Sequence, residues 1–254
     1  MWNLSGHLYS GLIREVAVYA YGAEAAWRLR RRCQVGQLRE HYDTWTHKPL
    51  AGAPRYFKSD VMELLTKNPW WVVPLLWVPI CTALAGYSLW LLAGDASRWA
   101  TCFASGVFGW QLIEYSLHRF VFHMAPRHPA FIVFHFALHG AHHKYPLDKM
   151  RLVFPPAPAF IIARIIFFGV SMLLGEMSTS LAVMAGVVAG YVMYDCTHYW
   201  CHHSKRLPRF LEAQKRVHMD HHYRNHDVSF GISSPLYDYV FGTRPASGLA
   251  CKEA

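Results

Sequence analysis

Four apolar stretches, each close to 20 residues long, restrict this chain to a small set of folds. They run from Trp70 to Leu92, Trp99 to Leu117, Pro155 to Leu174 and Ser180 to Tyr199. A helix needs about 20 apolar residues to cross roughly 30 Å of hydrocarbon, at a rise of about 1.5 Å per residue. Because 53% of the residues are hydrophobic and only 16% are charged, the chain fits the helical membrane class better than the soluble globular class.

Two short polar links, Ala93 to Arg98 and Gly175 to Thr179, join these stretches in pairs. Each pair is therefore expected to form a helical hairpin. Of the 25 Lys and Arg residues, ten precede Trp70, five lie between His118 and Val153, and eight follow Trp200. The positive-inside rule then places both termini and the segment between the hairpins in the cytosol.

The net charge of +9 follows from this topology, so no nucleic-acid partner is expected. The densest basic run, Arg28 to Arg32, adjoins an apolar stretch and is interpreted as a contact with anionic lipid headgroups. The six cysteines show no paired spacing, and disulfides are not expected in cytosolic or membrane segments. No cleavable signal is expected. We predict a cytosolic or interfacial region (1–69), a membrane-embedded domain (70–245) and a tail (246–254).

Histidine is the residue type whose number and spacing indicate chemistry. Of 17 histidines, ten form four groups near the predicted cytosolic ends of the spans: His118 and His123; His139, His142 and His143; His198 and His202; His218, His221 and His222. Neutral imidazole is the commonest metal ligand, and ten suit two metal ions with about five nitrogens each. The alternative, that they only cap helices or line a polar cavity, fits a single histidine better than four spaced groups.

Helix geometry explains three of the four groups. Positions i, i+3 and i+4 share one helix face, so the groups beginning at His139 and His218 can each aim at one point. His198 and His202 lie one turn apart. His118 and His123, in contrast, would diverge by about 140° on a regular α-helix. Either the helix ends between them or they serve different metals.

These patterns together define a fold class. We predict an all-α integral membrane protein with four transmembrane helices in two hairpins and a cytosolic helical cap that carries a histidine-rich dimetal site.

Two carboxylates are candidates for orienting the imidazoles. Asp195 precedes His198 by three positions and Glu114 precedes His118 by four. Metal-bound imidazoles usually donate their other N–H to a carboxylate or a carbonyl. The alternative for both is a salt bridge to Arg119 or another arginine.

Seven histidines lie outside the four groups. Three adjoin the groups and are candidates for further contacts with metal or substrate, with a structural role as the simpler interpretation: His226, His203 and His135. The other four are interpreted as surface residues: His7, His41, His47 and His128.

Several motifs resemble a known family. They are His118-Arg119-Phe120-Val121-Phe122-His123, His139-Gly140-Ala141-His142-His143-Lys144, Arg151-Leu152-Val153-Phe154-Pro155-Pro156, Gly190-Tyr191-Val192-Met193-Tyr194-Asp195, Thr197-His198-Tyr199, Phe230-Gly231-Ile232 and Val240-Phe241-Gly242-Thr243. Over roughly residues 40–245, the chain resembles the fatty acid hydroxylase superfamily, specifically the fatty acid 2-hydroxylases. Pro54-Arg55-Tyr56-Phe57 and Trp70-Trp71-Val72-Val73-Pro74 are similar to plant-type members that lack a fused cytochrome domain.

The resemblance implies a two-metal, O2-dependent enzyme of the endoplasmic reticulum membrane. It would hydroxylate carbon 2 of a long or very-long acyl chain that is destined for, or already in, a sphingolipid. The expected cofactor is di-iron, with electrons from NADPH through a separate cytochrome b5 and its reductase, although imidazole also binds zinc and a purified sample can contain it. The family's ten ligand positions fall on the ten grouped histidines. The spans would form a chamber for the acyl tail that opens to the bilayer.

Two alternatives remain open at this point. A sterol-type oxidase or desaturase has related histidine groups, and a sterol product would identify it. A zinc or iron transporter or sensor belongs to a different class. A transporter needs ionisable residues at mid-membrane, whereas the four groups cluster at the cytosolic edge, which favours the enzyme.

Overall fold

The structure is a computed structural model that describes residues 35–245, and this part of the chain contains helices and no strands. The helices are η1 (Val35–His41), α2 (Tyr42–Thr46), α3 (Asp60–Leu64), α4 (Val72–Leu91), α5 (Ala96–Ser116), η2 (Leu117–Phe122), α6 (Pro129–His135), η3 (Phe136–Gly140), α7 (Ala141–Lys144), α8 (Pro156–Leu174), α9 (Met177–His203), α10 (Arg209–Tyr223) and α11 (Leu236–Val240). The all-α prediction is thus confirmed. The basic run at 28–32 and His7 lie outside the described residues.

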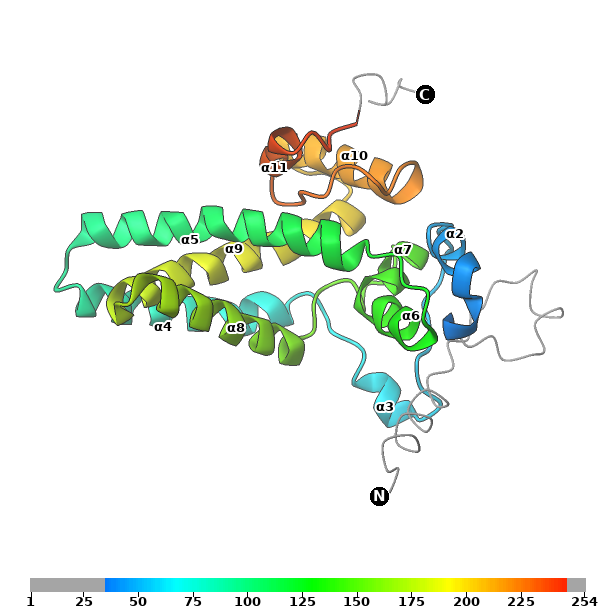
Figure 1. The fold of residues 1–254 in the computed structure, drawn as a ribbon, viewed down its shortest axis with the longest axis horizontal. Helices are drawn as coiled ribbons and strands as arrows, with labels where there is room; N and C mark the ends of the chain where they lie inside the picture. The colour runs from blue at the N-terminus through cyan, green and yellow to red at the C-terminus, as the bar shows by residue number, and fades with distance from the viewer. Residues whose placement is uncertain (1–34, 246–254) are drawn as a thin grey trace.

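The four longest helices form the two expected hairpins, α4–α5 and α8–α9 (Figure 1). Asp95 caps the start of α5 by accepting a hydrogen bond from the Arg98 backbone N–H. Gly175 ends α8 in the left-handed region, at φ 69°, which a residue without Cβ adopts at little cost. An ion pair between Arg98 and Glu176 joins the two hairpin turns.

Within residues 35–245, three helices are long and apolar enough to cross a membrane: α4, α8 and α9. α5 is 21 residues long and packs along α9, but it is not among these three. Much of the outer surface of α4 and α8 is apolar and exposed, including Leu75, Trp90, Phe168 and Leu173. Such a surface is expected where side chains face lipid rather than water.

Helix α9 is the centre of the bundle, in contact with α4, α5 and α8. Small residues let α5 and α9 approach to backbone contact. A Cβ at Gly106 would lie 2.0 Å from the Val183 carbonyl oxygen, and one at Gly186 would lie 2.0 Å from the Phe103 carbonyl oxygen. Close packing through small residues is common between membrane helices. This contact holds α9 in place, and with it the last turns of α9, which carry His198 and His202.

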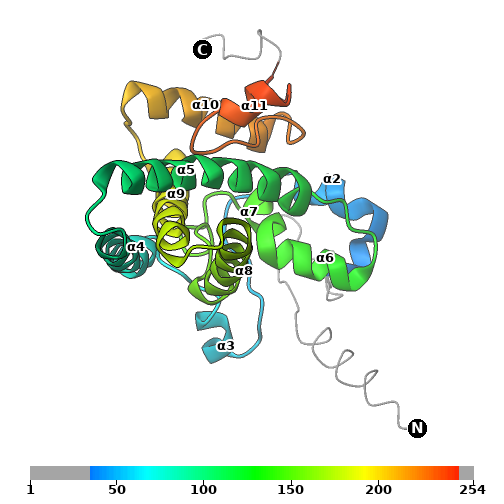
Figure 2. The same cartoon turned by 60° about the vertical axis from the view of Figure 1, so that its left-hand side comes forward.

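The histidine-rich segments form a cap at one end of the bundle. In Figure 1, α6 and α7 lie beyond the end of α5, and α10 and α11 lie over α5 in both views (Figures 1 and 2). Residues 35–57 are built into this cap, because Val35, Tyr42 and Tyr56 share a buried apolar cluster with Ile132 and Phe136. The sequence predicts that the N-terminal region lies on the membrane surface. The structure shows that its described part packs on the cap.

Candidate metal centre

Nine of the ten grouped histidines converge in two adjoining sets. The five-histidine group contains His142, His198, His202, His218 and His222, and the four-histidine group contains His118, His123, His143 and His221. Within each group, one nitrogen from every ring lies within 4.8 Å of the others. The groups touch because the adjacent residues His142 and His143 belong to different groups, as do His221 and His222. The rings of His143 and His222 stack with centroids 4.3 Å apart.

Regular helices build the five-histidine group. His198 and His202 lie one turn apart at the end of α9, and His218 and His222 lie one turn apart on α10. Each pair therefore projects from one helix face. His142 comes from α7 and completes the group, and all five side chains are buried. The spacing argument from the sequence holds for this group.

A π-helix resolves the spacing of His118 and His123. η2 continues α5 as a π-helix, and the backbone N–H of His123 donates to the His118 carbonyl oxygen at 3.1 Å. In a π-helix the hydrogen bond joins residues five apart, so positions i and i+5 share a face. Both side chains therefore belong to the same group. Of the two expected solutions, a helix end fits, because η2 ends at Phe122 and His123 is its C-cap residue.

His139 is the tenth grouped histidine and lies beside the four-histidine group. Its ring centroid is 4.7 Å from that of His143 and 5.0 Å from that of His118. Its Nε2 is buried and has no hydrogen-bond partner among residues 35–245. A buried nitrogen without a hydrogen-bond partner costs folding free energy. His139 is therefore the candidate for a fifth metal-binding imidazole beside the four-histidine group.

The separations between ring nitrogens test whether the groups fit metal ions. Four pairs of Nε2 atoms lie 2.9–3.1 Å apart: His198 and His142, His202 and His218, His222 and His218, and His221 and His123. Two nitrogens at about 2.0–2.1 Å from one ion are roughly 2.9 Å apart at a 90° angle, against roughly 3.4 Å at a tetrahedral angle. The donor set fits metal ions, and the separations suit five or six ligands better than four.

Burial keeps these imidazoles neutral. Desolvation lowers the pKa of His118 to about 4. Desolvation, followed by the neighbouring histidines, holds the pKa of His142, His143 and His218 well below its usual value. Neutral imidazole is the form that binds metals, so both groups present lone pairs at neutral pH.

The family model described as "Fatty acid hydroxylase" matches residues 103–243, a range that includes all ten histidines. This chain belongs to the fatty acid hydroxylase family.

Relatives and a solved structure agree with this assignment. The hydroxylase is 39% identical over 228 residues to "Dihydroceramide fatty acyl 2-hydroxylase FAH1" of Arabidopsis thaliana, with 87% of this chain and 93% of the relative covered. It is 38% identical to "Fatty acid 2-hydroxylase" of Homo sapiens, with 85% and 63% covered. The structure titled "Full length scs7p (only hydroxylase domain visible)" superposes with a TM-score of 0.81, 34% identity and 93% of each chain covered.

Backbone carbonyls orient two rings of the hydroxylase. His118 Nδ1 lies 2.6 Å from the Phe230 carbonyl oxygen, and His221 Nδ1 lies 2.7 Å from that of Val228. Each Nδ1 donates its proton, which leaves Nε2 as a ligand and fixes the ring. The sequence contains no signal for these contacts, because any residue can supply a carbonyl.

The two carboxylates expected to contact imidazoles have other partners, which corrects that prediction. Glu114 accepts hydrogen bonds from the backbone N–H groups of Ile232 and Ser233, at 2.6 and 2.7 Å, and from the Ser233 hydroxyl. It therefore holds the loop that follows Phe230. Asp195 accepts from the Phe154 backbone N–H at 3.0 Å. Arg119 donates to the Tyr115 hydroxyl, so it does not supply the alternative salt bridge.

The structure places the three additional candidates outside both groups. His135 uses both ring nitrogens elsewhere, with the Tyr42 hydroxyl and the Phe122 carbonyl oxygen each 2.6 Å away, which excludes it as a ligand. His203 packs on Tyr199, with ring centroids 4.6 Å apart. His226 forms a separate cluster with Asp43 and His47.

His47 does not lie where the sequence predicts. The prediction of a surface position fits His41 and His128, which are exposed, but His47 is half-buried. His47 instead stacks on His226, with centroids 3.5 Å apart, and contacts His143 edge-on at 4.9 Å. Lys144 fixes this segment, because its Nζ donates to the Trp45 and Lys48 carbonyl oxygens, each at 2.8 Å. His47 thus covers the outer side of the four-histidine group.

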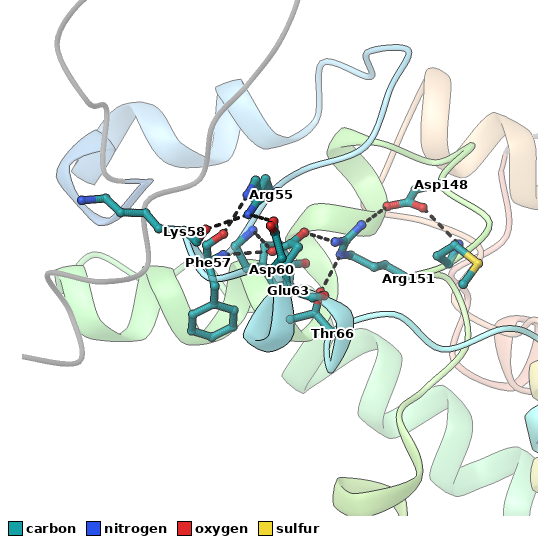
Figure 3. Close-up of polar contacts among 10 residues, drawn as sticks. Arg55, Phe57, Lys58, Asp60, Glu63, Thr66, Asp148 and Arg151 are labelled. Carbon is teal, nitrogen blue, oxygen red and sulfur yellow. Dashed lines mark hydrogen bonds and ion pairs between the residues drawn. The ribbon is translucent and has the colours of Figure 1, made fainter.

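A cavity of about 290 Å³ opens onto the rings of His139, His142 and His198. Arg151 forms part of its wall. The Arg151 guanidinium pairs with Glu63 and Asp148 and donates to Thr66 (Figure 3). These ion pairs are buried and tie α3 to the segment before α8, which gives the cavity a fixed polar wall next to the histidine groups.

Proposed function

We propose that this hydroxylase adds a hydroxyl group to carbon 2 of long or very-long acyl chains of ceramides or of their fatty acid precursors. The observation that carries the proposal is the pair of adjoining all-imidazole groups, which open onto a cavity at one end of membrane-length helices. One relative is named a "Dihydroceramide fatty acyl 2-hydroxylase" and another a "Ceramide very long chain fatty acid hydroxylase", which supports the position and the substrate class respectively. An oxidoreductase that acts on lipid acyl chains explains both the histidine groups and the cavity beside the membrane-length helices.

The histidines hold two metal ions in this proposal. The five-histidine group binds one ion, and the four-histidine group with His139 binds the other. Iron is the expected metal for activity, and zinc can replace it in purified protein because imidazole binds both. When bound, the metals supply the oxidant that an unactivated C–H bond requires.

The protein's own residues provide position and exclusion of water. Carbonyl oxygens of Val228 and Phe230 fix two ligand rings, and the buried pair of Arg151 and Glu63 fixes the wall against which the substrate's polar end lies. The acyl carbon to be hydroxylated must reach the face of the cavity formed by His142 and His198. One oxygen atom of O2 is inserted into the C–H bond. The other oxygen atom takes up two electrons and two protons and leaves as water.

The membrane arrangement follows from helix length and charge. We propose that α5 is the fourth span, because its 21 residues are enough to cross the hydrocarbon core and it packs along α9. Both termini and the histidine cap lie on the cytosolic side of the endoplasmic reticulum membrane. Residues 70–245 form the hydroxylase domain, residues 1–69 an interfacial region and residues 246–254 a tail. NADPH, a separate cytochrome b5 and its reductase supply the electrons.

The test is a lipid profile of cells that lack 2-hydroxylated sphingolipids. Cells expressing the wild-type chain should contain 2-hydroxy acyl ceramides, and cells expressing His142→Ala should not. The matched control is His128→Ala, which removes an exposed histidine and should leave the product unchanged. A sterol product, or no 2-hydroxy lipid despite expressed protein and available cytochrome b5, would contradict the proposal.

A further inference from the structure

A second cavity lies deeper in the helix bundle and is lined almost entirely by apolar side chains. Its α8 wall consists of Ala159, Ile162, Ala163 and Ile166, and its α9 wall consists of Met184, Val187, Val188 and Tyr191. Both sets have the i, i+3, i+4, i+7 spacing of a single helix face. The cavity is therefore an apolar slot between two helices that lie alongside each other (Figures 1 and 2).

Three aromatic residues connect this slot to the cavity at the metal ligands. Phe122, Phe154 and Tyr194 line both cavities. The rings of Phe122 and Phe154 are stacked with centroids 6.3 Å apart. Phe122 immediately precedes the ligand His123, and Tyr194 lies one turn before the ligand His198. An acyl chain with its second carbon at the metal ligands therefore meets these three rings first.

The depth of the slot can be measured along α9. Met184 precedes His198 by 14 residues, which corresponds to about 21 Å of helix axis. On α8, Ile166 lies seven residues beyond Ala159, or about 10 Å. Half of a hydrocarbon core of about 30 Å is roughly 15 Å, so the end of the slot at Ile166 and Met184 lies at a depth that only a long chain reaches.

The α8 wall is also the one that borders lipid. Among the residues of α8, only Ala159 is buried, whereas much of α9 is buried along its length. α8 is therefore the helix that separates the slot from the bilayer.

We propose that the acyl chain passes from the metal-bearing cavity between Phe122, Phe154 and Tyr194 into the slot between α8 and α9, and that Ala163, Ile166 and Met184 set the longest chain accepted. This inference rests on the proposed acyl 2-hydroxylation, and it assigns the residues that determine chain-length specificity.

The experiment compares the chain-length distribution of 2-hydroxy acyl ceramides in the same cells, supplied with a mixture of long and very-long fatty acids. Ala163→Phe narrows the slot and should lower the ratio of very-long to long products by about tenfold or more, since single-methylene differences in an apolar pocket are worth about 10–200-fold. Ile166→Ala extends the slot and should raise the same ratio.

The lipid-facing neighbour Ile165, 66% exposed, provides matched controls. Ile165→Phe and Ile165→Ala should leave the wild-type distribution unchanged. Product in the wild type with the same distribution in both slot variants, or an equal loss at every chain length in both, overturns the inference but not the proposed reaction. Absence of 2-hydroxy product from the wild type instead refutes the reaction itself.

Discussion

The two histidine groups differ in how they are built. The five-histidine group uses α-helical pairs on α9 and α10, and every member is buried. The four-histidine group takes His118 and His123 from a π-helix, relies on loop carbonyls for two rings, and includes the half-buried His123. We therefore expect the five-histidine group to be the more rigid and the four-histidine group to depend more on its surroundings.

The largest effect should come from removing a member of the five-histidine group. His218→Ala removes the ring whose Nε2 contacts both His202 and His222. Even the loss of a partner of a metal-bound imidazole costs about 10–100-fold, so loss of the ligand itself should reduce 2-hydroxy lipid formation by more than about 100-fold. His41→Ala, an exposed histidine, is the control. Retention of more than a tenth of wild-type activity in His218→Ala would show that this group is not required.

Acid should destabilise the metal-free protein through His118 of the four-histidine group. The pKa of His118 is about 4 in the folded chain, against 6.5 for a free histidine, so the unfolded state binds the proton more tightly. Stability from this residue is complete above pH 6.5 and is lost as the pH falls toward 4, by up to about 3 kcal/mol at about 1.4 kcal/mol per pKa unit.

The measurement is the free energy of unfolding in detergent between pH 7 and pH 4, for the metal-free wild type and for His118→Gln. The variant should show a smaller decrease. Identical pH dependence of the two proteins would contradict the assigned role of His118.

A smaller effect is expected from the loop that serves only the four-histidine group. Glu114→Gln replaces an oxygen that accepts from backbone N–H groups near Phe230, and should lower activity by about 10–100-fold through the orientation of His118. One metal ion should then dissociate faster in the presence of a chelator while the other is retained. Equal loss of both ions would show that Glu114 supports the whole centre rather than one group.

The smallest effect should come from the outer side of the four-histidine group. His47→Gln removes a ring stacked on His226, and aromatic pairs contribute about 0.5–1.5 kcal/mol. Activity should therefore fall by less than about tenfold, as measured by 2-hydroxy lipid formation. A loss as large as that of His218→Ala would instead make His47 a ligand.

The sequence predicted the regular parts of this structure and missed the parts that depend on tertiary contacts. Spacing by i, i+3 and i+4 identified the α9 and α10 ligands, because local helix geometry determines which side chains share a face. The same rule left two solutions open for His118 and His123, because the π-helix that brings them together is not visible in a residue pattern. Glu114 and Asp195 were selected by their spacing from His118 and His198, but their partners come from a loop and from the segment before α8, which local spacing cannot indicate.

His47 illustrates the same limit. It lies far along the chain from the cap, and only the packing of residues 35–57 against α6 and α7 brings it to His143. The hairpins, in contrast, follow from apolar length alone, because backbone groups in hydrocarbon must be satisfied within each helix.

Metal content per purified chain tests the central claim most directly, namely that the two histidine groups are separate metal sites. We predict about two ions per wild-type chain and about one per chain for His123→Ala, with the remaining ion held by the five-histidine group. A wild-type chain that binds no more than one ion, or a His123→Ala chain that still binds two, would contradict this account.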